Sequence, residues 1–167
     1  QYADKLAKRG EFVPHIAIAG GFAFEDQMFK GLAMGAPYFK AIEMARAPLT
    51  AAMVAKTIGK RIASGDMPVF VGRFGNSIEE VFVAASELKG KLGKDFEKVP
   101  PGALGVYTYL ERVSQGLRQM MCGARKFSLE HFRREDIAAL TPEASKISGI
   151  RHIMDLDKEE AEKILAS

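Results

Sequence analysis

Residues 15–48 read HIAIAGGFAFEDQMFKGLAMGAPYFKAIEMARAP, and this stretch decides the fold that the sequence predicts. The apolar run VPHIAIA, residues 13–19, is typical of a parallel strand that is buried on both faces. Gly20 and Gly21 end this strand, and a helix is expected over residues 24–36. A second strand is expected over residues 38–44. The spacing between the two strands suits a right-handed crossover, so the predicted fold class is α/β.

The rest of the chain predicts helices and loops. A helix is expected over residues 48–63, and the clearest amphipathic helical period covers residues 106–121. Residues 70–77 are expected to form a loop, and residues 94–105 a connector rich in proline and glycine. The residues expected to be buried in the first of these helices are Leu49, Met53, Ile58 and Ile62.

Several short polar residues mark further helix starts. Asn76 or Ser77 can cap a helix that runs to Lys91. Ser128 and Thr141 are also expected at helix starts, and Thr141 is followed by a proline at the first helical position. The residues of the last expected cap are Asp157 and Glu160, which have the spacing of a capping box.

The predicted strands are too few for a complete sheet, because two parallel strands are not stable alone. We therefore expect another chain, missing N-terminal sequence or self-association of this chain to cover their apolar faces. The first residue is Gln1 rather than methionine, which suggests that the chain has been cut from a longer one. The predicted division is residues 1–64 for the strand–helix units and residues 65–167 for a helical extension.

The composition is that of an ordinary globular protein, with 47% apolar and 27% charged residues. A formal net charge of +3 does not indicate nucleic acid or a membrane as a partner. No apolar run has the length needed to cross a bilayer. Cys122 is the single cysteine, so an intrachain disulfide is excluded and a cytoplasmic location is expected.

The sequence IAGGF places two glycines where a strand ends and a helix follows. Backbone N–H groups at Gly20 and Gly21 can approach an anion closely because no Cβ intervenes. The second strand is followed by another helix start, where Arg46 can donate to the same anion. The alternative is a tight turn beside an ordinary surface arginine, and a double glycine alone does not decide between them.

Other chemically reactive residues give weaker signals. His15, His131 and His152 lie far apart at no metal-ligand spacing, so we expect structural or surface roles and no metal site. Cys122 is expected to be a small buried residue. Glu43, near the end of a strand, is expected either to face a functional site or to pair with a base.

Basic residues lie near aromatic ones in the segments RQMMCGARKF and FRRED. Such segments can contact RNA, but here acidic residues are interleaved with them. We therefore expect a solvated surface and no nucleic-acid site.

The sequence IAGGFAFEDQMFKGLAMGAPYFKAIEMARAP resembles the end of the FMN-binding domain of glutamate synthases. It is most similar to the single-subunit FMN-binding glutamate synthase family of archaea and bacteria, whose last-strand signature resembles GLAMGAPYFKAIEMARA. The run from ELKGKLGKDFEKVPPGALG to FSLEHFRREDIAALTPEAS resembles the C-terminal helical extension of that family. The similarity covers nearly the whole chain.

The resemblance implies the C-terminal portion of a (β/α)8 TIM barrel, with its last two parallel strands and a mostly helical extension. It implies FMN as the cofactor of the complete barrel, and the reduction of 2-iminoglutarate, formed from 2-oxoglutarate and ammonia, to L-glutamate. The implied electron donor is ferredoxin or NAD(P)H. The implied cofactor-binding residues are Gly20, Gly21, Ala45 and Arg46, around the FMN phosphate. Catalytic residues are expected in the absent strands, and the isolated chain is expected to be inactive.

Two residues depart from the family pattern. The family usually has a cysteine in place of Glu43 and a glycine in place of Ala45. A Cβ at Ala45 can crowd a phosphate, and the carboxylate of Glu43 can repel it. No cysteine motif follows Arg46, so no iron–sulfur cluster is expected in this segment. The alternative function is a non-enzymatic assembly or interaction module with a decayed flavin site.

Overall fold

The computed structural model describes residues 2–166 and shows a mostly helical α/β protein with one two-stranded parallel sheet. The predicted order of strand, helix and parallel strand is confirmed. Within residues 2–166 the two strands pair only with each other, and they do not form a barrel. The first elements are α1 Tyr2–Lys8, β1 Ile16–Ala19, α2 Glu25–Gly35, β2 Phe39–Glu43 and α3 Arg46–Ser64.

The remaining elements are helical. They are α4 Val69–Gly72, α5 Ile78–Val81, α6 Ala85–Leu92, η1 Gly93–Lys98, α7 Pro101–Gly123, η2 Leu129–His131, η3 Arg134–Asp136, α8 Pro142–Ser148, η4 Ile153–Asp155 and α9 Lys158–Leu165. The chain divides into two compact units, each built from separate segments. The first unit contains residues 1–19, 26–43 and 120–167, and the second contains residues 20–25 and 44–119. The predicted division after residue 64 concerns the parent barrel and stays a prediction.

The sheet of the first unit has one half-buried and one exposed face. Ile18 pairs with Ile42 and both are half-buried, whereas Ala17 pairs with Ala41 and both are exposed. The expectation that the first strand is buried on both faces is therefore wrong for this chain, because no described element covers the side of Ala17 and Ala41.

Helix α2 buries one face in the first unit through Met28, Phe29 and Leu32. The ring of Phe29 meets the edge of Phe132 at a centroid distance of 4.9 Å, so the segment after α7 packs on α2. At the end of α2, a Cβ at Gly35 would overlap the ring of Phe39, and only glycine fits this turn into β2.

A single arginine joins two helix ends in the first unit. Nη1 of Arg134 donates to the carbonyl oxygen of Met34 at 2.9 Å, and Nη2 donates to the carbonyl oxygen of Ser148 at 2.5 Å. Both carbonyl groups lie at the C-terminal ends of helices, α2 and α8, where cations stabilise the unpaired acceptors. Arg134 therefore connects α2 with the segment that follows α7.

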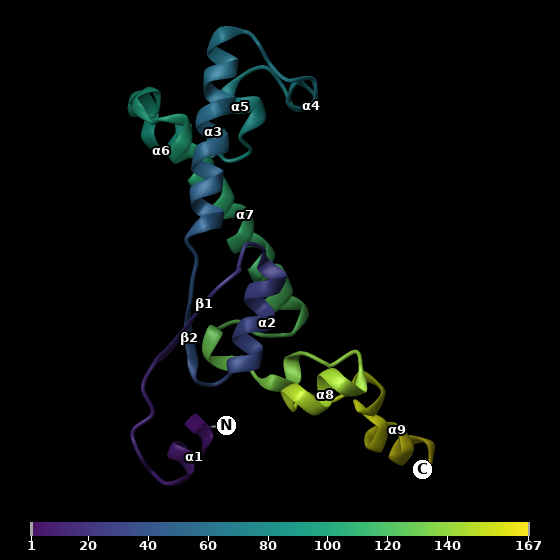
Figure 1. Ribbon diagram of the computed structural model, residues 1–167. Helices are drawn as coiled ribbons and strands as arrows, with labels where there is room; N and C mark the ends of the chain where they lie inside the picture. Colours follow the sequence, from purple (N-terminus) through teal and green to yellow (C-terminus); the bar gives the residue numbers. More distant parts are fainter. Residues whose placement is uncertain (1, 167) are drawn as a thin grey trace. The chain divides into compact units, whose positions relative to one another are not determined.

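The second unit is organised by a close crossing of α3 and α7 (Figure 1). A Cβ at Gly105 would lie 2.7 Å from the carbonyl oxygen of Ala51 and would overlap Ala55. A Cβ at Gly59 would lie 2.5 Å from Cγ of Pro101. The two backbones approach this closely because both helices present small residues at the contact.

This crossing explains why the buried face predicted for α3 is partly wrong. Leu49 and Met53 are 62% and 57% exposed, whereas Ala55 and Gly59 are buried. Hydrophobicity favoured the large side chains, but the close approach of α7 admits only small ones. Ile58 and Ile62, also expected to be buried, are half-buried.

The core of the second unit contains Phe82, Phe96 and Leu104 together with Ala55 and Ala85. The single helix expected from residue 77 to 91 is broken at residues 82–84, because Phe82 turns inward to join this core. The expected connector over residues 94–105 is also mostly helical. It contains η1 and the start of α7.

The predicted caps have mixed outcomes. Ser77 and Glu80 form a capping box at α5, and Oγ1 of Thr141 accepts a hydrogen bond from the N–H of Ala144 at 3.1 Å. Ser128 accepts from the N–H of Glu130, but it starts only the short η2. Asp157 precedes α9 in a left-handed conformation without a side-chain cap, so that capping box is wrong. The loop expected over residues 70–77 contains most of the one-turn helix α4.

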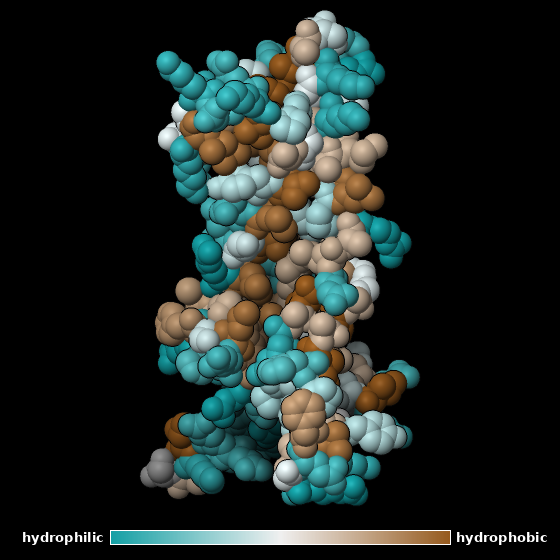
Figure 2. Space-filling model, turned by 90° about the vertical axis from the view of Figure 1, so that its left-hand side faces the viewer, coloured by the Kyte–Doolittle hydropathy of each residue, from teal (hydrophilic) through white to brown (hydrophobic). Residues whose placement is uncertain are grey.

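Large apolar side chains are exposed on both units. Figure 2 shows such side chains, in brown, among hydrophilic ones. Val69, Phe70 and Phe74, around α4, are 84%, 69% and 72% exposed. Among the helices of residues 2–166, none has both the length and the apolar character needed to cross a membrane.

Candidate functional site

The first loop of the predicted anion site follows β1. Gly20 has φ 117° and Gly21 has φ 74°, both in the region that L-residues with a side chain avoid. A Cβ built at either glycine meets nothing within 4 Å, so the side of the loop is open. Two glycines are thus required here by the backbone conformation, and they leave room for a ligand.

The second loop leads from β2 into α3. Ala45 has φ −120° and ψ −58°, so it lies outside the positive-φ region in which a glycine is needed. No side chain caps α3, and its first turn has no acidic residue. Pro48 lacks an N–H group, so Arg46 and Ala47 supply the free donors of this turn. Arg46 is the first residue of this 19-residue helix, and it is exposed.

Tyr109 of α7 ties the two loops together. Its hydroxyl donates a hydrogen bond to the carbonyl oxygen of Ala23 at 2.6 Å and lies 3.8 Å from Sδ of Met44. Burial raises the pKa of Tyr109, and the carboxylate of Glu25 adds to this effect. Tyr109 therefore remains a neutral donor at physiological pH. Tyr109 lies within the amphipathic period expected over residues 106–121, and that period gave no sign of this role.

The four predicted residues Gly20, Gly21, Ala45 and Arg46 thus belong to one compact unit. Together they offer exposed backbone donors, the positive end of α3 and one guanidinium group. This is the chemistry that binds a phosphate or a carboxylate. No ion pair within the described residues engages the side chain of Arg46, which leaves it available to a ligand.

Glu43 is exposed at the end of β2, and no described base forms an ion pair with it. Of the two alternatives for Glu43, pairing with a base is not found among the described residues, and the alternative that it faces a functional site stays a prediction. Glu43 lies two residues before Ala45 in the sequence. Cys122, expected to be buried, is exposed near the end of α7.

The histidines have separate surroundings. Nδ1 of His152 accepts a hydrogen bond from the N–H of Met154 at 3.4 Å and caps η4. Within residues 2–166, no group of three His, Cys, Asp or Glu side chains is placed to hold a metal ion. The expectations about metals and iron–sulfur clusters stay predictions for the parent protein.

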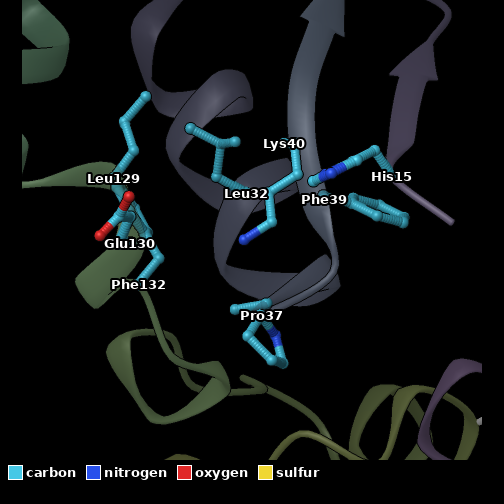
Figure 3. Close-up of a pocket in the computed structure, with 9 residues that line it drawn as sticks. His15, Leu32, Pro37, Phe39, Lys40, Leu129, Glu130 and Phe132 are labelled. Atoms are coloured by element: carbon cyan, nitrogen blue, oxygen red, sulfur yellow. The ribbon is translucent and has the colours of Figure 1, made fainter. Parts of the chain in front are cut away.

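A separate cavity of about 370 Å³ lies in the first unit, at the amino-terminal ends of the two strands (Figure 3). It is lined by His15, which precedes β1, by Phe39 and Lys40 of β2, and by Glu130 of η2. The residues that complete its wall are Leu32, Ala36, Pro37, Leu129 and Phe132. Sequence reasoning missed this cavity, because its walls come from segments about a hundred residues apart that no local pattern connects.

Comparison with known proteins found no significant match for this chain among protein-family models, curated proteins or solved structures.

Proposed function

We propose that this chain is the C-terminal part of an FMN-dependent oxidoreductase resembling the glutamate synthases, and that it supplies the phosphate-binding end of the flavin site. The observation that supports this is a pair of open loops at the carboxyl ends of adjacent parallel strands. Ala19 pairs with Glu43, and the glycine loop and the start of α3 follow these residues directly. In many (β/α)8 barrels the loops after the last two strands hold a phosphate group.

The residues present fit a phosphate. Gly20 and Gly21 allow the backbone N–H groups to approach an oxygen atom, and no neighbouring atom fills the space beside them. Arg46 can donate two hydrogen bonds to a phosphate, and the uncapped start of α3 adds a partial positive charge. The backbone of Ala45 does not require a glycine, and its Cβ narrows the space for a phosphate in this loop.

In the proposed enzyme, the chain positions the cofactor and does not carry the reacting groups. When bound, reduced FMN supplies the electrons that convert 2-iminoglutarate into L-glutamate. Tyr109 keeps the two loops together through Ala23 and Met44, so it is a positioning residue in this proposal. The groups that contact substrate belong to the other strands of the barrel.

The proposal requires further strands on the sheet. The exposed face at Ala17 and Ala41, and the free edges of β1 and β2, are the surfaces that those strands would cover. They come either from the remaining barrel segment of the parent protein or from self-association. The electron donor in this proposal is ferredoxin or NAD(P)H, and neither a membrane nor a nucleic acid takes part.

A second candidate function is a non-enzymatic assembly module with a decayed flavin site. The exposed apolar side chains of Val69, Phe70 and Phe74 favour it, because a cluster of this kind on a soluble surface often marks an interaction site. The carboxylate of Glu43, close to the second loop in the sequence, also favours it, because a negative charge there opposes phosphate binding.

Titration of the full chain with FMN, followed by quenching of flavin fluorescence, tests the first function. We expect saturable binding that Arg46→Ala weakens about tenfold, because one charge-assisted bidentate contact is lost. Arg73→Ala is the matched control, since Arg73 is an exposed arginine of the same compact unit. We expect that variant to bind FMN like the original chain.

Absence of saturable FMN binding would contradict the first function for this chain. Equal losses in Arg46→Ala and Arg73→Ala would show a general charge effect and remove Arg46 from the site. Sedimentation of the same samples then tests the second function. Phe70→Ser together with Phe74→Ser should shift a self-associating chain to the monomer.

A further inference from the structure

The cavity between the strand starts and η2 contains unpaired charges of both signs. Lys40 lies on one side of it, and Glu130 lies on the other (Figure 3). Neither side chain forms an ion pair or a side-chain hydrogen bond with any described residue, and the same holds for His15. Some exposed lysines, such as Lys30 and Lys89, pair with a neighbouring carboxylate, whereas others, such as Lys56, pair with no described residue.

The open space between Lys40 and Glu130 separates two opposite charges that line the same cavity. A ligand with a single charge would meet a like charge on one of the two sides. A ligand with an anionic and a cationic end meets a complementary partner on each side. The charges of the cavity therefore select a zwitterion.

The rest of the wall is apolar, and two of its residues are fixed by packing. Leu32 and Phe132 are 6% and 4% exposed, and the ring of Phe132 is held against Phe29. Pro37 and Phe39 add further apolar surface. A volume of about 370 Å³ is at the lower end of the range for small-molecule sites, so it suits a small molecule with an apolar body.

We propose that this cavity binds an α-amino acid with an aliphatic side chain. Lys40, assisted by the imidazole N–H of His15, binds the carboxylate of the amino acid. Glu130 accepts hydrogen bonds from its ammonium group, and the apolar wall around Leu32 holds its side chain. This inference does not depend on the proposed flavin function, because none of these residues belongs to the two loops after the strands.

Titration of the full chain with L-leucine, monitored by two-dimensional amide NMR spectra, tests the proposal. Isocaproate lacks the amino group of leucine, and isoamylamine lacks its carboxylate. We expect saturating shifts for L-leucine in the amides of β2 and η2, and about tenfold weaker binding of each analogue. Flavin titrations report on the other unit, so the two tests can fail separately.

Two variants that each remove one charge show which residue binds which end of the ligand. In Lys40→Met, L-leucine should lose its advantage over isoamylamine, because the carboxylate has lost its partner. In Glu130→Gln, L-leucine should lose its advantage over isocaproate. Both substitutions are at exposed positions and should leave the fold intact. The matched controls, Lys56→Met on α3 and Glu162→Gln on α9, should bind L-leucine unchanged.

The proposal is wrong if L-leucine gives no saturating shifts in β2 and η2. It is also wrong if isocaproate or isoamylamine binds as tightly as L-leucine. Equal losses in Lys40→Met and Lys56→Met would show an effect of net charge, and this result too would overturn it.

Discussion

The hydroxyl group of Tyr109 donates a 2.6 Å hydrogen bond to the carbonyl oxygen of Ala23. The two residues lie 86 positions apart in the sequence, and the bond is partly buried. It joins the middle of α7 to the loop after β1. The glycine loop and the start of α3 are therefore held by a helix that contributes no residue to the predicted anion site.

Replacing Tyr109 by phenylalanine should destabilise the second unit. The hydrogen bond from the Tyr109 hydroxyl to the carbonyl group of Ala23 is lost while the aromatic ring remains, which should lower the free energy of unfolding by about 1 kcal/mol. Urea unfolding monitored by circular dichroism measures this change. Tyr107→Phe is the control, because its hydroxyl accepts a hydrogen bond from the exposed Lys91 at 3.2 Å. Similar losses in both variants would contradict the role assigned to Tyr109.

Two Gly→Ala substitutions, one at the crossing of α3 and α7 and one away from it, should have opposite effects on stability. Gly105→Ala should lower the free energy of unfolding by about 1–3 kcal/mol, because its Cβ would overlap Ala55 and force the helices apart. Gly90→Ala in α6 should raise it by up to about 1 kcal/mol, because alanine favours helix and meets no neighbour there. Urea unfolding of both variants checks this pair. An unchanged free energy of unfolding in Gly105→Ala would contradict the close approach of the two helices.

Arg134 should contribute more to the stability of the first unit than its neighbour. Arg134→Lys cannot reach both the Met34 and the Ser148 carbonyl groups, so we expect a loss of about 1–3 kcal/mol in the free energy of unfolding. Arg133→Lys is the control, since Arg133 is exposed and its side chain holds no such pair of carbonyl groups. Thermal unfolding measures the stability of both variants. Equal melting temperatures of Arg134→Lys and Arg133→Lys would contradict the stabilising role of the two hydrogen bonds from Arg134.

The capping box of α5 should make the second unit sensitive to acid. Hydrogen bonds from the N–H of Asn76, and from the side chain and N–H of Ser77, hold the pKa of Glu80 below its ordinary value of 4.5. A carboxyl group whose pKa is lowered by folding stabilises the folded state above its unfolded pKa. That stabilisation is lost as the pH falls through the folded pKa.

Glu80→Gln should therefore lose less stability than the original chain between neutral pH and about pH 3. The amide oxygen can still accept a hydrogen bond, but it does not titrate. Urea midpoints at the two pH values measure the difference. Glu162→Gln, an exposed position of α9, is the control and should keep the original acid dependence. An unchanged acid dependence in Glu80→Gln would contradict the role of this carboxylate.

The sequence by itself determined the features that depend on neighbouring residues. The order of strand, helix and parallel strand follows from hydrophobic runs interrupted by Gly20 and Gly21. The start of α5 at Ser77 and the start of α8 at Thr141 follow from side chains that bond to an N–H three residues later. Each of these signals lies within a few residues of its effect, so the local pattern was sufficient.

Only the tertiary structure decided which faces are buried and which distant residues meet. The close approach of α7 buries Ala55 and Gly59 of α3 and leaves Leu49 and Met53 exposed, because steric fit overrides hydrophobicity at a helix crossing. The hydrogen bond from Tyr109 to Ala23 also joins segments that no local pattern relates. The same holds for the cavity that Lys40 shares with Glu130, since contacts between distant segments are set by packing of the whole unit.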